Sequence, residues 1–104
     1  MKLQHLYSVY ILLCADKSYY TGITNDLDRR FEEHNTGIDP KCYTFSRRPL
    51  ILKHYEQYQN INEALSREKQ IKKWSRKKKE ALIKDDFEEL KKLAKNKVNR
   101  NEVL

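Results

Sequence analysis

The chain has few of the residues that bend, staple or interrupt a polypeptide. Its 104 residues include two glycines, two prolines and two cysteines. So little glycine and proline excludes collagen-like, linker-like and low-complexity sequences. The isolated Cys14 and Cys42 provide neither a zinc-binding spacing nor the framework of a disulfide-rich secreted domain. A reducing cytoplasm is therefore the expected compartment.

Long apolar runs are missing as well. The most apolar stretch near the start, residues 6–13, is eight residues long and contains Tyr7, Ser8 and Tyr10. A helix that crosses a bilayer needs about 20 apolar residues, and no small residue precedes Cys14 as it would in a lipoprotein anchor. We therefore expect no signal peptide, no lipid anchor and no membrane partner, and this stretch is better explained as a strand.

Positive charge is abundant and concentrated. The chain has 22 basic and 15 acidic residues, and residues 66–84 alone contain nine basic and two acidic ones, so this segment carries the whole excess of +7. A block of this kind is typical of a surface that binds a polyanion such as nucleic acid, and a basic solubilising surface is the alternative. The predicted nucleic-acid-binding residues are Arg67, Lys69, Lys72, Lys73, Arg76, Lys77 and Lys78, together with Arg47 and Arg48 in a polar loop.

Hydrophobic periodicity predicts a small α/β (α+β) domain. Alternating and β-branched residues predict strands at 7–13, 18–23 and 50–58, the first two forming a hairpin. A three-residue connection at 15–17 would put Tyr10 opposite Gly22 and Leu12 opposite Tyr20. Regular alternation in the third strand would put Leu52, His54 and Glu56 on one face.

Capping residues and apolar stripes predict the helices. A helix from Asn25 or Asp26 should run to about residue 35 and end at Gly37. Asn60 should begin a helix to about residue 74, with its buried stripe at Ile61, Ala64, Leu65 and Ile71. Ser75 and Asp86 should cap two more helices. We assign residues 1–84 to the main domain and 85–104 to a C-terminal amphipathic helix and tail of the same domain.

Three polar residues occupy positions on these helices that should face the core. Arg30 and His34 lie on the stripe of the first helix, and Glu68 lies at the centre of the stripe of the second. A buried Arg30–Glu68 ion pair with a hydrogen-bonded histidine would explain them structurally. Such pairs stabilise weakly, because desolvation offsets most of the attraction, so a charged cleft that also includes Tyr10 and Tyr20 is the better explanation.

Phosphodiester hydrolysis is the chemistry that suits this set. The Glu68 carboxylate can hold one Mg²⁺ or Mn²⁺ ion that is otherwise hydrated, and the fork of Arg30 fits a phosphate. A tyrosine can take the proton of the attacking water if a nearby cation lowers its pKa from about 10.

The spacing of these residues resembles the GIY-YIG nuclease superfamily over about residues 7–84. The resemblance rests on Val9-Tyr10-Ile11, Tyr20-Thr21-Gly22, the ten-residue steps from Tyr10 to Tyr20 and to Arg30, the following His34, and Glu68. It is strongest for small stand-alone bacterial GIY-YIG proteins and extends to the N-terminal nuclease domain of the excinuclease C subunit. It implies a three-stranded antiparallel β-sheet flanked by helices.

The resemblance also implies a role for each residue that matches. Tyr10 and Tyr20 take the positions of the two signature tyrosines, either of which can activate water. Arg30 would clamp phosphate, His34 would support proton transfer or phosphate binding, and Glu68 would bind the metal, while Gly22 is the turn glycine of the second motif. Val9 replaces the glycine of the first motif, and Ile23 stands where some relatives have a lysine that could acidify a tyrosine.

The sequence therefore predicts a divalent-metal-dependent endonuclease that cleaves DNA by a one-metal mechanism, with a role in DNA repair or recombination. In 104 residues we find no room for a separate DNA-reading domain, so substrate shape or a protein partner should supply specificity. A noncatalytic nucleic-acid-binding module with the same fold is the alternative. A third possibility is an adaptor that binds another protein through the helix around Leu90 and Leu93.

Overall fold

The structure is a computed structural model that describes residues 6–94, and the chain divides into two compact units. The N-terminal unit, Met1–Lys73, contains β1 (Tyr7–Leu13), β2 (Tyr19–Thr24), α1 (Leu27–Thr36), the 3-10 turn η1 (Phe45–Arg47), β3 (Ile51–Tyr58) and α2 (Ile61–Lys72). The C-terminal unit, Trp74–Leu104, contains α3 (Arg76–Ile83) and a helical segment at residues 87–94. The strands form one antiparallel sheet in the order β2-β1-β3. The predicted α+β fold with a three-stranded antiparallel sheet is confirmed.

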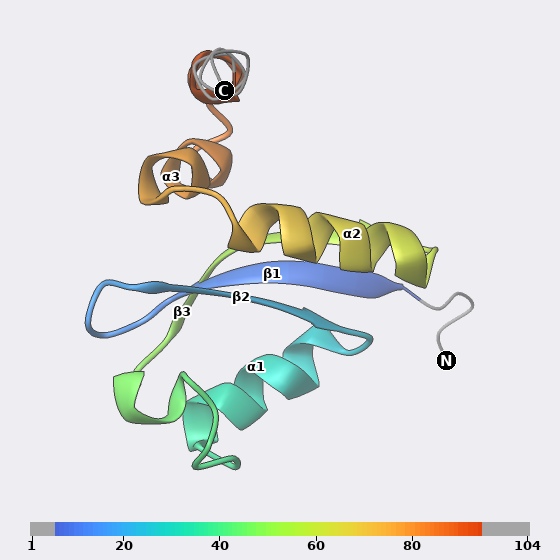
Figure 1. Ribbon diagram of the computed structural model, residues 1–104. Helices are drawn as coiled ribbons and strands as arrows, with labels where there is room; N and C mark the ends of the chain where they lie inside the picture. Colours follow the sequence, from blue (N-terminus) through green and yellow to red (C-terminus); the bar gives the residue numbers. More distant parts are fainter. Residues whose placement is uncertain (1–5, 95–104) are drawn as a thin grey trace. The chain divides into compact units, whose positions relative to one another are not determined.

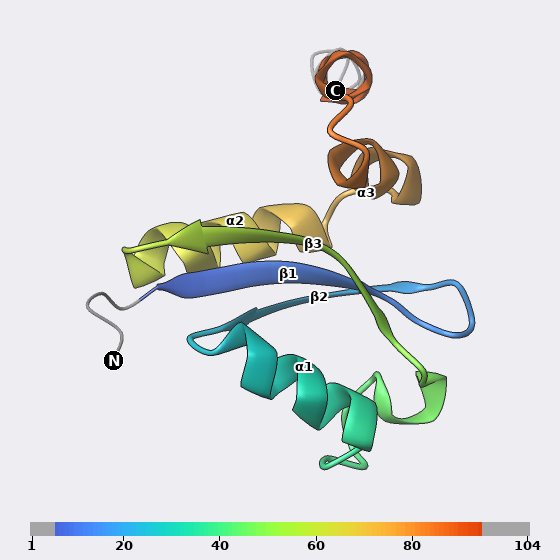
Figure 2. The same cartoon turned by 180° about the vertical axis from the view of Figure 1, so that it is seen from behind.

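The central strand β1 is apolar along most of its length because both faces of the sheet are covered. In the N-terminal unit, α1 lies on one face of the sheet and α2 on the other (Figures 1 and 2). On the α1 face, Leu27 and Phe31 pack against the buried cluster around Tyr10 and Leu12. On the other face, α2 packs on all three strands. The sequence of a strand that is buried on both faces is a continuous apolar run rather than an alternation of apolar and polar residues.

The hairpin register is the predicted one, with Tyr10 opposite Gly22 and Leu12 opposite Tyr20. The Cys14 amide donates to the Ser18 carbonyl at 2.8 Å, which closes a three-residue turn at 15–17. A Cβ atom at Gly22 would collide with the hydroxyl and ring of Tyr10. Glycine is therefore needed at this position because the Tyr10 ring fills the space that a side chain would take.

The predicted alternation of β3 is wrong, because the strand contains a β-bulge. Its register against β1 shifts so that Leu52 lies opposite Leu12 while His54 lies opposite Ile11, which leaves Lys53 as an extra residue. Leu52 therefore joins the α1 face of the sheet, where it packs on the Tyr10 cluster. His54 is turned to the α2 face.

Glu56 follows His54 on the α2 face and accepts hydrogen bonds there from three side chains. His54 lies at 2.8 Å, Tyr58 at 2.6 Å, and Arg67 of α2 donates from two nitrogens at 2.8 and 3.0 Å. Burial alone would raise the pKa of Glu56, but these bonds hold it well below its usual range. These bonds anchor Arg67, one of the predicted nucleic-acid-binding residues, to the sheet.

The helices begin at the predicted capping residues. Asp26, Asn60, Ser75 and Asp86 each accept a hydrogen bond from a backbone amide of the following turn. Gly37 ends α1 in the left-handed conformation, with φ of 72°.

The predicted stripe of α2 is only partly right. Ala64 and Ile71 are buried, but Ile61 and Leu65 are 39% and 37% exposed. The line from Ala64 to Ile71 that faces the sheet is flanked by the half-buried Glu68, as the pattern predicts, and by the half-buried Arg67, which the predicted stripe did not include.

The C-terminal unit is short and basic. Ala81 and Leu82 of α3 are buried, and the Lys78 ammonium lies 4.4 Å from the centre of the Trp74 ring. In the segment at 87–94, Phe87 is exposed and Leu90 is half-buried. Among residues 6–94, no helix has both the length and the apolar character that crossing a membrane requires.

Adjacent residues of β2 should respond to substitution in opposite ways. Gly22→Ala should lower the free energy of unfolding by about 1–3 kcal/mol, because the new methyl group overpacks the site of the Tyr10 ring.

Thr21 is buried, and its hydroxyl has no hydrogen-bond partner in the described part of the chain. Thr21→Val keeps its shape and should leave stability unchanged or raise it by about 1 kcal/mol. Chemical denaturation measures both, and a Gly22→Ala variant as stable as the parent protein would contradict this packing.

Candidate active site

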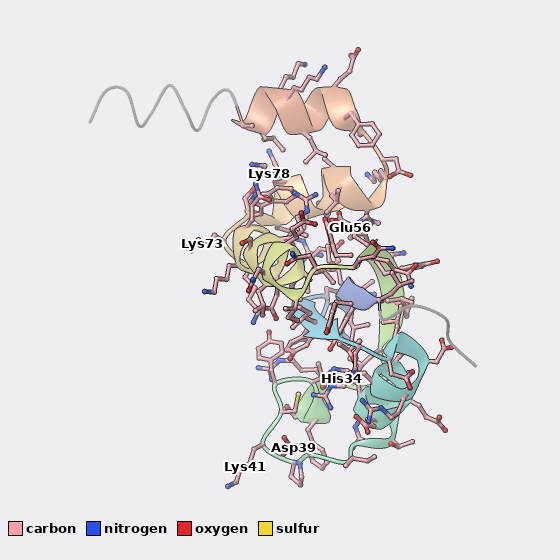
Figure 3. All side chains as sticks on the ribbon, turned by 90° about the vertical axis from the view of Figure 1, so that its right-hand side faces the viewer. His34, Asp39, Lys41, Glu56, Lys73 and Lys78 are labelled. Carbon is pink, nitrogen blue, oxygen red and sulfur yellow. The ribbon has the colours of Figure 1, made fainter. Side chains whose placement is uncertain are left out.

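A tyrosine and a histidine meet in the interior of the N-terminal unit. Tyr10 comes from β1 and His34 from α1, and they are 1% and 3% exposed. The Tyr10 hydroxyl oxygen lies 3.0 Å from His34 Nε2. Leu27 and Phe31 fix the rotation of α1 by packing on the sheet, and His34, one and two turns further on, consequently points at the same face. Figure 3 shows His34 directed from α1 toward the sheet.

Burial keeps both members of this pair neutral. Burial and, to a lesser degree, Arg30 lower the pKa of His34 to about 4, and Glu33 partly opposes them. Burial also raises the pKa of Tyr10 well above its ordinary value, Tyr20 adds to the rise, and a hydrogen bond from Arg30 opposes it. At neutral pH the pair is therefore a protonated phenol and an uncharged imidazole. Arg30 lowers the pKa of Tyr10, as a nearby cation was expected to do, but burial outweighs it.

Tyr20 stands beside this pair and is half-buried. Its ring centre lies 5.2 Å from that of His34 and 6.4 Å from that of Tyr10. Burial raises its pKa, as do the Cys42 sulfur and the Glu68 carboxylate, while Arg30 opposes them. Tyr20 therefore lies close enough to Arg30 of α1 and to Glu68 of α2 for both charges to act on its hydroxyl.

Tyr20 is held by a stack of side chains from the loop between α1 and β3. The Tyr43 ring lies nearly parallel to it, with the ring centres 6.1 Å apart. The Arg47 guanidinium lies 3.8 Å from the centre of the Tyr43 ring and also pairs with Asp16 at 3.0 Å. Arg47, predicted to bind nucleic acid, therefore joins this loop to the β1–β2 turn.

The buried ion pair between Arg30 and Glu68, which was the alternative to a charged cleft, is not formed. Arg30 pairs with Glu33 at 3.1 Å and Glu68 pairs with Lys72 at 3.3 Å, each within its own helix. Residues three or four apart on a helix are neighbours, so each charge finds a closer partner than the other helix offers. Arg30 and Glu33 are 31% and 28% exposed at their side chains, and a pair this accessible is weak enough for a ligand to open.

Glu68 is the carboxylate that could hold a metal ion. Its side chain is 13% exposed, and it acts electrostatically on Tyr20. Within residues 6–94, no group of three or more His, Cys, Asp or Glu side chains is arranged to hold a cation. One carboxylate suits Mg²⁺, which commonly keeps several waters and binds phosphate oxygens of the substrate. Glu68 therefore fits the predicted one-ion site.

Two residues of the site were missed by the sequence interpretation. The Thr44 hydroxyl lies 2.8 Å from His34 Nδ1, and Cys42 Sγ lies 3.4 Å from that hydroxyl. Both belong to the irregular loop after Gly37, which has no periodicity to indicate which side chains turn inward. Together with Arg30, Glu33 and His34 they line a small cleft. In Figure 3, Asp39 and Lys41 of the same loop lie away from His34.

Hydrogen bonds between side chains and the backbone also fix the position of this loop. Arg48 donates to the carbonyl oxygens of Phe45 and Asn35 at 2.8 and 3.4 Å. The Asn35 side chain accepts from the Leu50 amide at 3.1 Å. Arg48, which we predicted to bind nucleic acid, thus serves to hold the loop against the end of α1.

The remaining predicted nucleic-acid-binding residues lie on two helices. On α2, Lys69 and Lys73 are exposed and Lys72 pairs with Glu68. On α3, Arg76 and Lys77 are exposed, whereas Lys78 is half-buried over Trp74.

Comparisons with known proteins agree with this arrangement. The family model for the GIY-YIG catalytic domain matches residues 6–81. A UPF0213 protein of Syntrophus aciditrophicus is 48% identical over 82 residues, which cover 79% of this chain and 94% of that protein. A UPF0213 protein of Bacillus pumilus is 43% identical over 79% of this chain and 83% of its own.

Two solution structures are also similar. A UPF0213 protein from Bacillus halodurans has a TM-score of 0.51 at 40% identity and covers 76% of this chain and 83% of its own. A protein from E. faecalis has a TM-score of 0.57 at 36% identity and covers 84% and 92%. A family model that spans most of the chain, with relatives of this identity and length, establishes that the chain belongs to the GIY-YIG catalytic domain family, whose fold is that of a nuclease.

Proposed function

We propose that this protein is a divalent-metal-dependent endonuclease that hydrolyses DNA phosphodiester bonds in the cytoplasm, in DNA repair or recombination. The observation that carries the proposal is the buried contact between Tyr10 and His34 beside Arg30. A phenol and an imidazole in contact, with a guanidinium near enough to act on both, can bind a phosphate and move a proton, which a purely structural core would not require. Glu68, acting on Tyr20 from α2, supplies the metal-binding group.

Arg30 is the group that would receive the scissile phosphate. Its present partner is the Glu33 carboxylate, 3.1 Å away and accessible to solvent. A phosphate oxygen pair has the charge and shape of a carboxylate, and Arg binds both through its fork. A phosphate that replaced Glu33 would lie near the Tyr10 hydroxyl, because Arg30 pairs with Glu33 and also acts electrostatically on Tyr10.

Tyr10 and His34 would then carry the proton of the attacking water. As the water oxygen bonds to phosphorus and the leaving oxygen departs, the Tyr10 oxygen takes the water proton and passes its own proton to His34 Nε2. Burial is the main reason that His34 is uncharged, and the charge of Arg30 adds to it. A phosphate next to Arg30 would offset the contribution of Arg30 and make the imidazolium easier to form. A divalent cation held at Glu68 would neutralise the negative charge that builds on the phosphate and the leaving oxygen.

The decisive experiment compares two glutamates of the same helix. Glu68→Gln should abolish cleavage that depends on Mg²⁺ or Mn²⁺, because the amide keeps the shape but removes the charge that holds the cation. Glu63→Gln, at an exposed position of α2, should cleave like the parent protein. The assay uses end-labelled duplex, single-stranded, flapped and branched DNA, with RNA counterparts. Circular dichroism confirms that both variants fold.

The outcomes of this assay separate the candidates. Cleavage of the RNA counterparts alone would overturn the choice of DNA. Salt-sensitive binding to every substrate without cleavage by the parent protein would show a noncatalytic binding module instead. Equal cleavage by Glu68→Gln and Glu63→Gln would show that the Glu68 carboxylate is not needed for cleavage and does not hold the metal ion.

Freeing Arg30 from its carboxylate should strengthen substrate binding. In Glu33→Gln the guanidinium no longer has a charged competitor for the phosphate, so KM should fall several-fold while kcat changes little. Glu32→Gln is the control, because Glu32 is an exposed carboxylate of the same helix that carries the same charge. A KM that falls equally in both variants would show only a general effect of net charge.

The exposed lysines of α2 should contribute to binding through the DNA backbone. Replacing Lys69 or Lys73 by alanine should weaken binding to all sequences alike and reduce the slope of log K against log salt by about 1 each. Fluorescence anisotropy over a range of salt concentrations measures the slope. Lys53→Ala, an exposed lysine of β3 outside the basic block, should leave it unchanged, and an equal change there would contradict a role for α2.

A further inference from the structure

Thr44 is buried, and its hydroxyl faces the nitrogen of His34 that does not contact Tyr10. The residue is 1% exposed, and its Oγ1 lies 2.8 Å from His34 Nδ1. A buried hydroxyl is normally retained only where it has hydrogen-bond partners. The two ring nitrogens of His34 thus have separate partners, Tyr10 at Nε2 and Thr44 at Nδ1.

The directions of these hydrogen bonds follow from the donors that are present. The Tyr10 hydroxyl is buried, and among residues 6–94 His34 Nε2 is the group within hydrogen-bond distance of it that can accept. A buried O–H without an acceptor would be destabilising. Tyr10 therefore satisfies its own O–H by donating to His34 Nε2, which must be unprotonated to accept. An uncharged imidazole has a single N–H, so the proton of His34 is on Nδ1 and points to Thr44. The Thr44 hydroxyl accepts this N–H and can in turn donate a hydrogen bond to Cys42 Sγ, which lies 3.4 Å away.

No other group around His34 competes closely for Nδ1. The groups that face the ring are Tyr10 from β1, Tyr20 from β2, Arg30 and Glu33 from α1, and Cys42 from the loop. Of the contacts made to Nδ1 within residues 6–94, the Cys42 sulfur is at 3.8 Å and the Thr44 oxygen is a full ångström nearer. Thr44 is consequently the nearest acceptor for the proton that Nδ1 carries in this tautomer.

We infer that Thr44 is a positioning residue that holds His34 in the Nδ1–H tautomer, so that Nε2 is open to receive the proton of Tyr10. The inference rests on the proposed function for its catalytic consequence, but the tautomer itself is a property of the folded protein. With the proton on Nε2 instead, the imidazole would donate to Tyr10 and could accept nothing from it. The proton path from water through Tyr10 would then be closed.

The first test reads the tautomer directly and needs no substrate. Two-bond ¹⁵N–¹H correlation spectra of the uniformly ¹⁵N-labelled protein at neutral pH distinguish a protonated from an unprotonated ring nitrogen. We expect His34 to have Nδ1 protonated and Nε2 bare. His34→Gln identifies its signals by their loss. A proton found on Nε2 in the unsubstituted protein overturns the inference, whatever the activity.

The second test removes only the hydroxyl. In Thr44→Val the Nδ1–H has no acceptor, so the tautomer should move toward Nε2–H and kcat should fall about 10- to 100-fold, part of the roughly 10²- to 10⁴-fold that a positioned acid–base group contributes. KM should change little, because Thr44 does not touch the substrate. Thr44→Ser restores the hydroxyl and should restore both the tautomer and kcat.

The two readings separate a failure of this inference from a failure of the proposed function. An Nδ1–H tautomer that is lost in Thr44→Val and restored in Thr44→Ser supports the positioning role even if no substrate is cleaved, in which case only the proposed nuclease activity is refuted. A Thr44→Val variant that keeps the Nδ1–H tautomer, or that keeps the parent kcat while losing it, refutes the inference and leaves the nuclease activity standing.

Discussion

The hydrogen bond between Tyr10 and His34 sets requirements that much of the N-terminal unit meets. A phenol and an imidazole removed from water must each find partners, because an unpaired polar group in a protein interior destabilises it by about 1–3 kcal/mol. Gly22 leaves the space in which the phenol ring is seated. The packing of Leu27 and Phe31 aims His34 at the strand, and the loop after α1 turns inward at Thr44 to serve the second ring nitrogen.

Burial also decides how the site handles charge. It keeps the imidazole and the phenol uncharged, while the charged Arg30 and Glu68, 31% and 13% exposed at their side chains, pair with neighbours on their own helices. The more exposed of these pairs, that of Arg30, can exchange its partner at little cost. The buried groups are therefore those suited to moving a proton, and the more exposed Arg30 is suited to binding an anion.

Local pattern was enough to predict the strands, the helix caps and the hairpin register, because each depends on residues close together in the chain. The spacing of Tyr10, Tyr20, Arg30 and His34 predicted the group that the structure assembles around β1 and α1. Three features could not be read this way. The bulge at Lys53 depends on pairing with β1, the Arg67–Glu56 contact joins α2 to β3, and the inward turn of Thr44 depends on a loop without periodicity. Each is a non-local arrangement that leaves no periodic trace in the sequence.

The bulge in β3 bears on how this protein behaves when it is concentrated. β3 is an outer strand of the sheet and, at eight residues, the longest of the three. A regular outer strand presents an unbroken row of amides and carbonyls on which strands of other molecules can assemble into aggregates. The extra residue, Lys53, interrupts this row of backbone groups, and a bulge of this kind bends its strand. Lys53 is also exposed. Two molecules that approached each other along β3 would therefore bring like charges together. The bulge therefore opposes aggregation through the same strand that completes the sheet.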